Sequence, residues 1–251
     1  MNLRKNDHVI LEVNALELMY SRDLILSDIS FAVNSGSCFV IMGVSGCGKS
    51  TLLKSMTGLL KPAQGNIRFS GGELWGRAEL PNQDLLSKFG VLFQGGALWG
   101  SMNLLENISL PLQTFTSLSN EEIESLASYK LSLVGLSGCE YLYPSQLSGG
   151  MQKRAGLARA LSMDPSILFL DEPSAGLDPI NSSQLDELIG ELKNSLGLTF
   201  VVVTHELKSI FEIADDAVFL SKETKSVLEQ GKPVELQKFS MHPEVRDFLS
   251  S

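Results

Sequence analysis

The chain has 251 residues, of which 43% are hydrophobic, and this is enough for one large α/β domain with an inserted subdomain. The formal net charge of −9 argues against a general nucleic-acid binder, so we expect no nucleic-acid partner. The odd number of cysteines, Cys38, Cys47 and Cys139, includes no C-x-x-C pair and indicates neither a disulfide framework nor a zinc site. A reducing compartment such as the cytosol fits this cysteine usage best.

Membrane-directed segments are not expected. The opening residues M-N-L-R-K-N-D-H lack the apolar stretch of a secretory signal. No run approaches the ~18 apolar residues that a membrane-spanning helix needs. If the protein serves a membrane process, another chain must supply the spanning helices.

The first part of the chain predicts strands, then a glycine-rich loop, then a helix. Residues 9–13 and 29–33 are short β-rich runs, and residues 39–42 are an apolar run of strand length that ends at the loop. After the loop, apolar residues recur at helical spacing from 52 to 60, and Lys61-Pro62 ends that helix.

The remainder predicts a helical segment followed by buried strands. Residues 95–165 are mostly helical, with the clearest patterns at 121–133 and 150–163. Residues 167–170 and 199–203 are buried β runs, typical of a parallel sheet covered on both faces. Two later strands are predicted at 216–220 and 226–228, and a short helix at 243–249.

Residues 43–50 read G-V-S-G-C-G-K-S, which matches the phosphate-binding pattern G-x-x-x-x-G-K-[ST]. Its glycines let backbone N–H groups point at phosphate oxygens, and the following helix adds its positive end. Lys49 is expected to reach the β- and γ-phosphates of ATP, and Ser50 to hold Mg²⁺. The strand before and the helix after favour this over a chance glycine turn. The expected nucleotide-binding set is Gly43, Ser45, Gly46, Cys47, Gly48, Lys49, Ser50 and Thr51.

Residues 166–172 read S-I-L-F-L-D-E, a buried strand that ends in two carboxylates. Asp171 is expected to ligate Mg²⁺, directly or through water. Glu172 is expected to orient and deprotonate the attacking water. An acidic turn after a strand is common by itself, but downstream of a phosphate-binding loop it favours these roles.

Residues 147–152 read L-S-G-G-M-Q, and here the chain resembles the ATP-binding cassette (ABC) family over nearly its whole length. Ser148 can cap the helix that follows, which leaves N–H groups exposed beside Gly149 and Gly150. The resemblance implies that this end binds the γ-phosphate held by a second copy of the chain. Two copies would thus sandwich two ATP·Mg²⁺ in a head-to-tail dimer.

The resemblance assigns four further positions. Gln94, in V-L-F-Q, matches the Q-loop glutamine that touches Mg²⁺ and the attacking water. Asp178 ends the D-loop S-A-G-L-D, and His205, in V-V-V-T-H-E, matches the switch histidine near the γ-phosphate. Tyr20 matches the aromatic residue that stacks on adenine, although an aromatic near an N-terminal strand is also typical of a core.

The resemblance implies a P-loop α/β core, formed by residues 1–94 and 166–251, with an N-terminal antiparallel β portion. A helical subdomain, roughly 95–165, is inserted after the Q-loop and would transmit motion to a separate permease. Leu98, Trp99 and Met102 are candidates for the contacting groove, and ordinary helical core is an equal alternative.

Short segments of the sequence indicate which class of ABC transporter the chain resembles. Four features look like the ATPase of Mla-type phospholipid transporters, which work with a permease and an MCE-domain lipid carrier at the inner membrane: residues 90–112, Met151 after the glycines, G-L-D-P-I, and the tail H-P-E-V-R-D-F-L. The expected location is therefore the cytoplasmic face of that membrane. An amino-acid-type importer is the main alternative, and an iron–sulfur assembly ATPase a lesser one.

Overall fold

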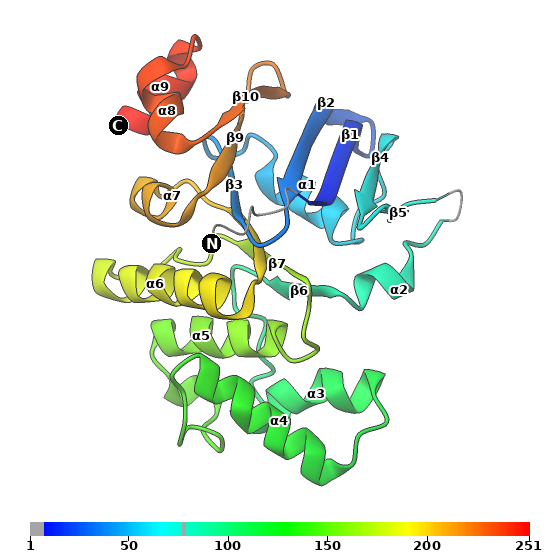
Figure 1. The fold of residues 1–251 in the computed structure, drawn as a ribbon, viewed down its shortest axis with the longest axis vertical. Coiled ribbons are helices and arrows are strands. Elements are labelled where there is room, and N and C mark those ends of the chain that lie inside the picture. The colour runs from blue at the N-terminus through cyan, green and yellow to red at the C-terminus, as the bar shows by residue number, and fades with distance from the viewer. Residues whose placement is uncertain (1–7, 77–78) are drawn as a thin grey trace, which may run out of the picture.

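A six-stranded sheet forms the centre of the computed structural model, which describes residues 8–76 and 79–251 (Figure 1). Its order is β10-β9-β3-β8-β7-β6, and the strands are parallel except β10, which runs antiparallel to β9. Because parallel strands end at one edge, the loops after β3, β7 and β8 meet there. The bounds are β3 (Cys38–Met42), β6 (Phe89–Leu92), β7 (Ile167–Asp171), β8 (Thr199–Val203), β9 (Asp216–Leu220) and β10 (Val227–Gly231).

The central sheet is covered on both faces, as the continuous apolar runs predict. In β3, Phe39 and Ile41 belong to one core cluster, whereas Val40 and Met42 belong to the other. The first cluster includes apolar residues from β1, β2, β4 and α1. The second includes residues from the helices on the opposite face.

The N-terminal portion is an antiparallel sheet of order β2-β1-β4-β5. Its strands are β1 (Val9–Tyr20), β2 (Asp23–Asn34), β4 (Gln64–Phe69) and β5 (Gly72–Glu73). β1 continues well past the predicted run at 9–13. A register shift between Val13 and Leu16, with Ala15 at a φ of 44°, restores the inward direction of the next apolar side chains.

Helix α1 (Lys49–Met56) follows the glycine loop and packs against strands of both sheets. The predicted helix ran to Leu60 and is too long. Gly58 has a φ of 79°, which is not helical, so the chain turns out of the helix after Thr57. Leu59 consequently lies outside the helix and is 61% exposed.

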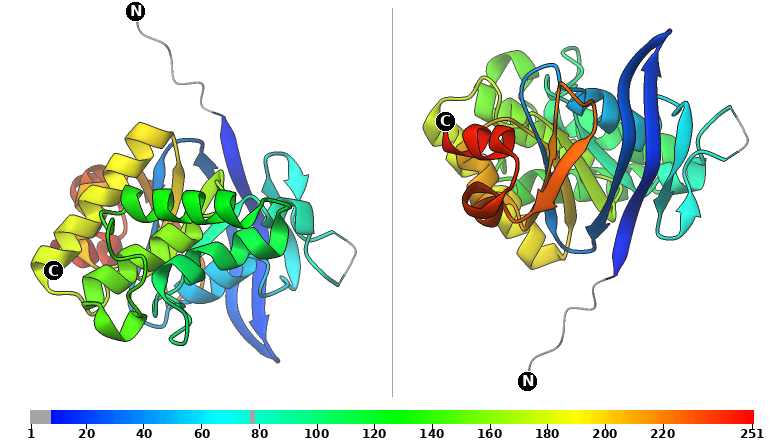
Figure 2. Two further views of the ribbon diagram at one scale, coloured as in Figure 1. Left: turned by 90° about the horizontal axis from the view of Figure 1, so that it is seen from below. Right: turned by 90° about the horizontal axis from the view of Figure 1, so that it is seen from above.

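The segment 95–165 is described throughout and contains helices only: α3 (Leu104–Phe115), α4 (Asn120–Leu133), the short 3₁₀ turn η1 (Pro144–Gln146) and α5 (Gly149–Ala160). The small helix α2 (Gln83–Leu86) precedes β6. Figure 2 (left) shows these green helices as a layer across one side of the molecule. Their apolar faces share one core cluster with the central sheet, so the helical layer is packed directly on the core.

The C-terminal part contributes α6 (Pro179–Leu196), α7 (Leu207–Ile213), α8 (Pro233–Phe239) and α9 (Pro243–Ser250). Helix α6 is capped by Asp178, starts with a proline and ends at Gly197 in the left-handed region. In the described part of the chain, no helix has the length and apolar character needed to cross a membrane.

Candidate functional site

The phosphate-binding loop joins β3 to α1 and needs glycine at two positions for steric reasons. Gly43 has a φ of 147°, and a Cβ there would lie 2.5 Å from the carbonyl oxygen of Leu220. Gly48 has a φ of 104°, and a Cβ there would lie 3.0 Å from the Leu26 side chain. A side chain at Gly43 would therefore clash with backbone, and one at Gly48 would displace Leu26 and strain a left-handed backbone.

Lys49 closes over the loop from the first turn of α1. Its buried ammonium group donates to the carbonyl oxygens of Gly43, at 2.8 Å, and Val44, at 3.2 Å. The residue at the helix N-cap is Gly48, which has no side chain to occupy the free N–H groups of the first turn. The N-terminal end of α1 and the ammonium group of Lys49 thus form a binding site that suits the phosphates of a nucleotide.

Ser50 and Asp171 meet across the sheet edge. The Ser50 hydroxyl donates to Asp171 Oδ1 at 3.0 Å. Burial raises the pKa of the Asp171 carboxyl, and the hydrogen bond from Ser50 opposes that rise. A hydroxyl and a half-buried carboxylate beside a phosphate cradle fit Mg²⁺, which takes few protein ligands and completes its shell with phosphate oxygens and water.

Glu172 and His205 also come together. His205 Nδ1 lies 2.8 Å from Glu172 Oε1. The other oxygen, Glu172 Oε2, is buried and has no hydrogen-bond partner within the described residues. Glu172 has a φ of 46°, a conformation that costs a non-glycine residue about 1–2 kcal/mol. The unpaired carboxylate oxygen of Glu172 can accept a proton from a water molecule, so this residue suits the role of a general base.

The signature segment and the D-loop lie against each other. Ser148 caps α5 by accepting a hydrogen bond from the Met151 N–H at 3.3 Å. A Cβ on Gly150 would lie 2.6 Å from Oδ1 of the Asn181 side chain, so a larger residue here would displace that side chain. Asn181 in turn donates to Asp178, and this hydrogen bond is the main cause that lowers the pKa of the Asp178 carboxyl. The exposed ends of α5 and α6 therefore form one surface.

The predicted residues fall into two groups. The phosphate loop, the Ser50–Asp171 pair and the Glu172–His205 pair gather at the carboxyl edge of the central sheet. Ser148 and Asp178 are exposed, and no hydrogen bond among the described residues joins either one to the phosphate loop. Tyr20 ends β1 with 65% of its surface exposed, so its ring is free to stack on a base.

Gln94 lies in the loop after β6 with its side chain exposed. The Cys47 side chain, by contrast, is only 3% exposed and packs in the core cluster behind the loop. Burial raises the pKa of the Cys47 thiol, and nearby Lys49 opposes that rise. Only the backbone of Cys47 is therefore suited to a phosphate contact.

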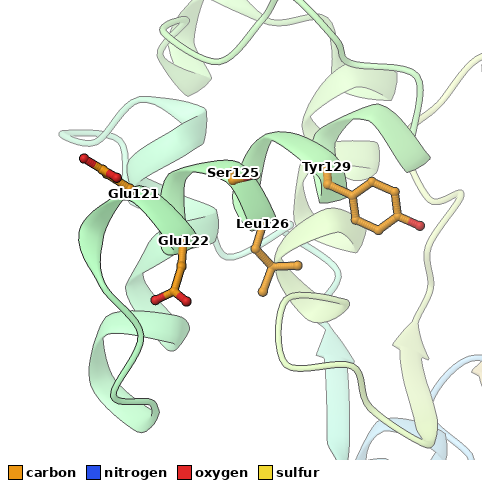
Figure 3. Close-up of a pocket in the computed structure, with 5 residues that line it drawn as sticks. All are labelled: Glu121, Glu122, Ser125, Leu126 and Tyr129. Atoms are coloured by element: carbon orange, nitrogen blue, oxygen red, sulfur yellow. The ribbon is translucent and has the colours of Figure 1, made fainter.

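A separate hollow of about 480 Å³ lies on α4 (Figure 3). Its lining residues all belong to this one helix, which Figure 1 places at the opposite end of the molecule from the N-terminal sheet: Glu121, Glu122, Ser125, Leu126 and Tyr129. None of them belongs to a nucleotide-binding motif. The hollow is therefore an open feature of the helix surface.

Comparison with known proteins identifies the family to which these site residues belong. A profile of the ABC transporter family matches residues 26–175. The chain belongs to the ABC transporter family. As an ABC ATPase it binds and hydrolyses ATP, and ABC ATPases form dimers that work with membrane permeases.

Two curated relatives are equally similar to this ABC ATPase. The probable ribonucleotide transport ATP-binding protein mkl of Mycobacterium tuberculosis is 40% identical over 242 residues, 96% of this chain and 67% of the relative. The intermembrane phospholipid transport system ATP-binding protein MlaF of Escherichia coli is 40% identical over 225 residues, 90% of this chain and 82% of the relative.

Two solved structures share the fold. CbiO1 from Clostridium perfringens, part of the ABC transporter complex cbiONQ, has a TM-score of 0.82 and 30% identity, covering 90% of each chain. The ATP-binding cassette MJ0796, solved as a dimer after hydrolysis with ADP and Pi bound, has a TM-score of 0.77 and 28% identity, covering 89% of this chain and 98% of that one. The predicted fold class is therefore confirmed.

Sequence reasoning missed one buried cation beside the site. Lys153 of α5 is only 7% exposed, and its ammonium group contacts the loops that carry Gln94 and Glu172. A lysine between Gln152 and Arg154 in a polar stretch after the signature glycines gives no signal of burial. Its partners lie 59 and 19 positions away in the sequence, so only the fold brings them together.

Proposed function

We propose that this ABC ATPase powers the movement of phospholipids between membranes through a separate permease, at the cytoplasmic face of the inner membrane. The observation that carries the proposal is the 40% identity to MlaF over 90% of the chain. The segment around residues 90–112, Met151, G-L-D-P-I and the tail V-R-D-F-L support the same class. An MCE-domain lipid carrier is the expected third component.

The proposed division of labour follows the geometry of the sheet edge. Lys49 and the loop bind the phosphates, while Ser50, Asp171 and Gln94 hold Mg²⁺, which supplies charge neutralisation at the phosphates when bound. Glu172 takes a proton from the attacking water, and His205 fixes the orientation of its carboxylate. Tyr20 stacks on the adenine.

Ser148, Gly149, Gly150 and Asp178 belong to the site of a second copy in this proposal. Ser148, Gly149 and Asp178 are exposed on the surface formed by α5 and α6, whereas Gly150 is buried against Asn181. No hydrogen bond among the described residues joins Ser148 or Asp178 to their own phosphate loop. The N-terminal end of α5 then meets the γ-phosphate held by the partner, because free N–H groups and the helix dipole attract anions. Each dimer would contain two such shared sites.

An apolar cavity of about 450 Å³ is the proposed permease contact. It lies between β6, α3 and the end of α5, and Phe93 connects it to the adjacent Gln94. The earlier candidates Leu98, Trp99 and Met102 do not line it. Its main apolar lining is Leu86, Phe89, Val91, Phe93, Phe115 and Met163, with Arg159 as a cation at the edge.

The test is reconstitution of the chain with its permease and carrier in liposomes. We expect ATP-dependent transfer of labelled phospholipid, and we expect Glu172→Gln to slow turnover by ~10²–10⁴-fold because the general base is lost. Turnover at the normal rate by Glu172→Gln would refute its role. ATPase activity stimulated by an amino acid and its receptor, without lipid transfer, would support the importer alternative instead. Co-purification with soluble iron–sulfur scaffold proteins would contradict a role in transport.

The same assay tests the cavity with a matched pair of variants. Phe115 and Phe239 are both 74% exposed, but only Phe115 lines the cavity. Phe115→Glu should retain basal ATP turnover and lose lipid transfer, because a carboxylate without a partner is costly to bury at an apolar contact. Phe239→Glu should retain both. Equal transfer by the two variants would place the permease elsewhere.

A further inference from the structure

Two loops of the candidate site are held from behind by one buried side chain. Lys153 lies in the second turn of α5, and its ammonium group donates to the carbonyl oxygen of Gln94 at 2.5 Å and to that of Glu172 at 3.4 Å. The first residue belongs to the Q-loop, and the second is the proposed base. Lys153 thereby joins the signature helix to both loops of its own chain.

The backbone at Glu172 needs such support because it is strained. Its φ of 46° lies in the left-handed region, where a non-glycine residue persists only when the surroundings hold it. The N–H of Glu172 donates to the Val203 carbonyl at 2.9 Å. Its carbonyl oxygen accepts from the Ala175 N–H at 3.1 Å as well as from Lys153. The lysine therefore completes the set of contacts that fix this turn.

The same helix holds the Q-loop at two further points. Arg159 donates to the carbonyl oxygen of Ala97, which also has a left-handed φ of 52°. Between the two cations, Gly156 lies so close to the Q-loop that a Cβ would approach the Gly96 carbonyl oxygen to 2.9 Å. The segment after β6 is therefore attached along α5 rather than only at Lys153.

Packing alone does not explain a lysine at this position. Burial lowers the pKa of the Lys153 ammonium group, which shows that the charge is costly here, whereas Asp171, Glu172 and Glu206 oppose that change. An apolar side chain of similar length would fill the space without this cost. Unlike an apolar side chain, the ammonium group of Lys153 donates hydrogen bonds to two carbonyl oxygens.

We propose that Lys153 is a positioning residue for ATP hydrolysis, which sets the backbone of Glu172 and Gln94 from the signature helix. Because the N-terminal end of this same helix is the proposed contact to the partner's nucleotide, Lys153 connects the base of one site to the signature surface of the other. The proposal rests on the proposed roles of Glu172 and Ser148. It assigns Lys153 no contact with the nucleotide.

The test compares single-turnover hydrolysis and ATP affinity in the full chain. Lys153→Met should lower the hydrolysis rate by about 10- to 100-fold, because a small displacement of a catalytic group has effects of this size, while the Kd for ATP stays within about 3-fold. Lys153→Arg, which keeps the charge and donors, should restore most of the rate. Lys153→Gln keeps the amide N–H donors but loses the charge, and it replaces the Met variant if that variant does not fold.

Lys130→Met is the matched control. Lys130 lies on α4, is 3% exposed and pairs with Asp164 at 2.5 Å. The variant therefore also removes a buried ammonium group, but one that lies away from the site. We expect its hydrolysis rate to stay within about 3-fold of wild type. An equal loss in the Lys130 and Lys153 variants would show a general packing effect and overturn the proposal.

A double-mutant cycle distinguishes positioning from damage. If Lys153 acts through Glu172, Lys153→Met should add little to the loss already caused by Glu172→Gln, because the group being positioned is gone. Independent multiplication of the two losses, or a wild-type rate for Lys153→Met, would overturn the proposal. A Glu172→Gln protein of normal activity would instead contradict the proposed function itself.

Discussion

At the residue scale, the phosphate loop separates the roles of backbone and side chain. Its glycines are fixed by close approaches to Leu220 and Leu26, and Lys49 closes the loop with two hydrogen bonds. Cys47 sits in the middle of this loop with its side chain turned into the core. A reactive group can thus lie in a binding motif and remain inaccessible.

This burial predicts the order in which the cysteines react. Maleimide requires an exposed thiolate, and both burial and the raised pKa of the Cys47 thiol work against it. Cys139 is only half-buried, so it should label at least ~10-fold faster than Cys47 in the native protein. Mass spectrometry of timed samples measures both rates, with urea-unfolded protein as the control. Rapid labelling of Cys47 that ATP·Mg²⁺ prevents would show that the thiol faces the phosphates.

Residue-level motifs were predictable, whereas contacts across the fold were not. The sequence placed Lys49, Ser50 and Asp171 in a nucleotide site because their types and spacing carry the chemistry. It contained no sign that Lys153 would be buried against Gln94 and Glu172, since those contacts depend on how α5 packs on β6. It also pointed to Leu98, Trp99 and Met102 as permease contacts and not to the cavity that we propose, because Phe115 and Leu86 come together only in the folded chain.

At the element scale, α6 connects the D-loop to the segment that carries His205. Asp178 caps α6 by accepting from the backbone N–H groups of Ile180 and Asn181. One turn further along α6, Ser182 donates to Glu206 at 3.4 Å. One more turn along, Asp186 accepts from Ser209 in α7 at 2.7 Å. These hydrogen bonds hold the start of α7 directly after His205.

The Asp186 contact predicts a pH-dependent stability. Asp186 is 1% exposed, and burial raises its carboxyl pKa to about 6, with Glu212 and Glu206 adding to the rise and Ser209 and Lys208 opposing it. A raised pKa favours the folded state below the unfolded pKa, and this contribution disappears as the pH rises through 6. At neutral pH the buried carboxylate is therefore ionised at a cost.

Asp186→Asn removes that titration and keeps an acceptor for Ser209. The measured quantity is the free energy of unfolding of the variant minus that of wild type. We expect this difference to be about 1–1.5 kcal/mol larger at pH 8 than at pH 5. Urea unfolding at both pH values measures this, with the exposed Asp84→Asn as the control. The same difference at both pH values would contradict the assignment.

Element boundaries show where sequence patterns stop being informative. The strand at 199–203 was predicted with its observed bounds because it is buried on both faces and, apart from Thr199, apolar. The helix after the loop was predicted too long, because Leu59 and Leu60 continue its spacing although Gly58 has already turned the chain. α6 escaped prediction since its polar residues, among them Ser182 and Asp186, form buried contacts with α7.

At the scale of the whole molecule, the proposed hydrolysis site needs a second copy of the chain. One chain gathers the phosphate loop, Asp171, Glu172 and His205, but leaves Ser148 exposed on the surface formed by α5 and α6. In a two-fold dimer the same pair of surfaces is used twice, so two complete sites form together. The relative MJ0796 was solved as a dimer with ADP and Pi bound.

Mixing two inactive variants tests this claim most directly. Lys49→Ala loses the phosphate-facing charge, and Ser148→Arg blocks the surface offered to the partner, so each homodimer should be inactive. A mixed dimer holds one site with an intact Lys49 from one chain and an intact Ser148 from the other. Because random pairing makes half of the dimers mixed, ATPase activity of the mixture should recover to about a quarter of wild type. A mixture as inactive as its components, or an active Ser148→Arg homodimer, would contradict a site shared between two chains.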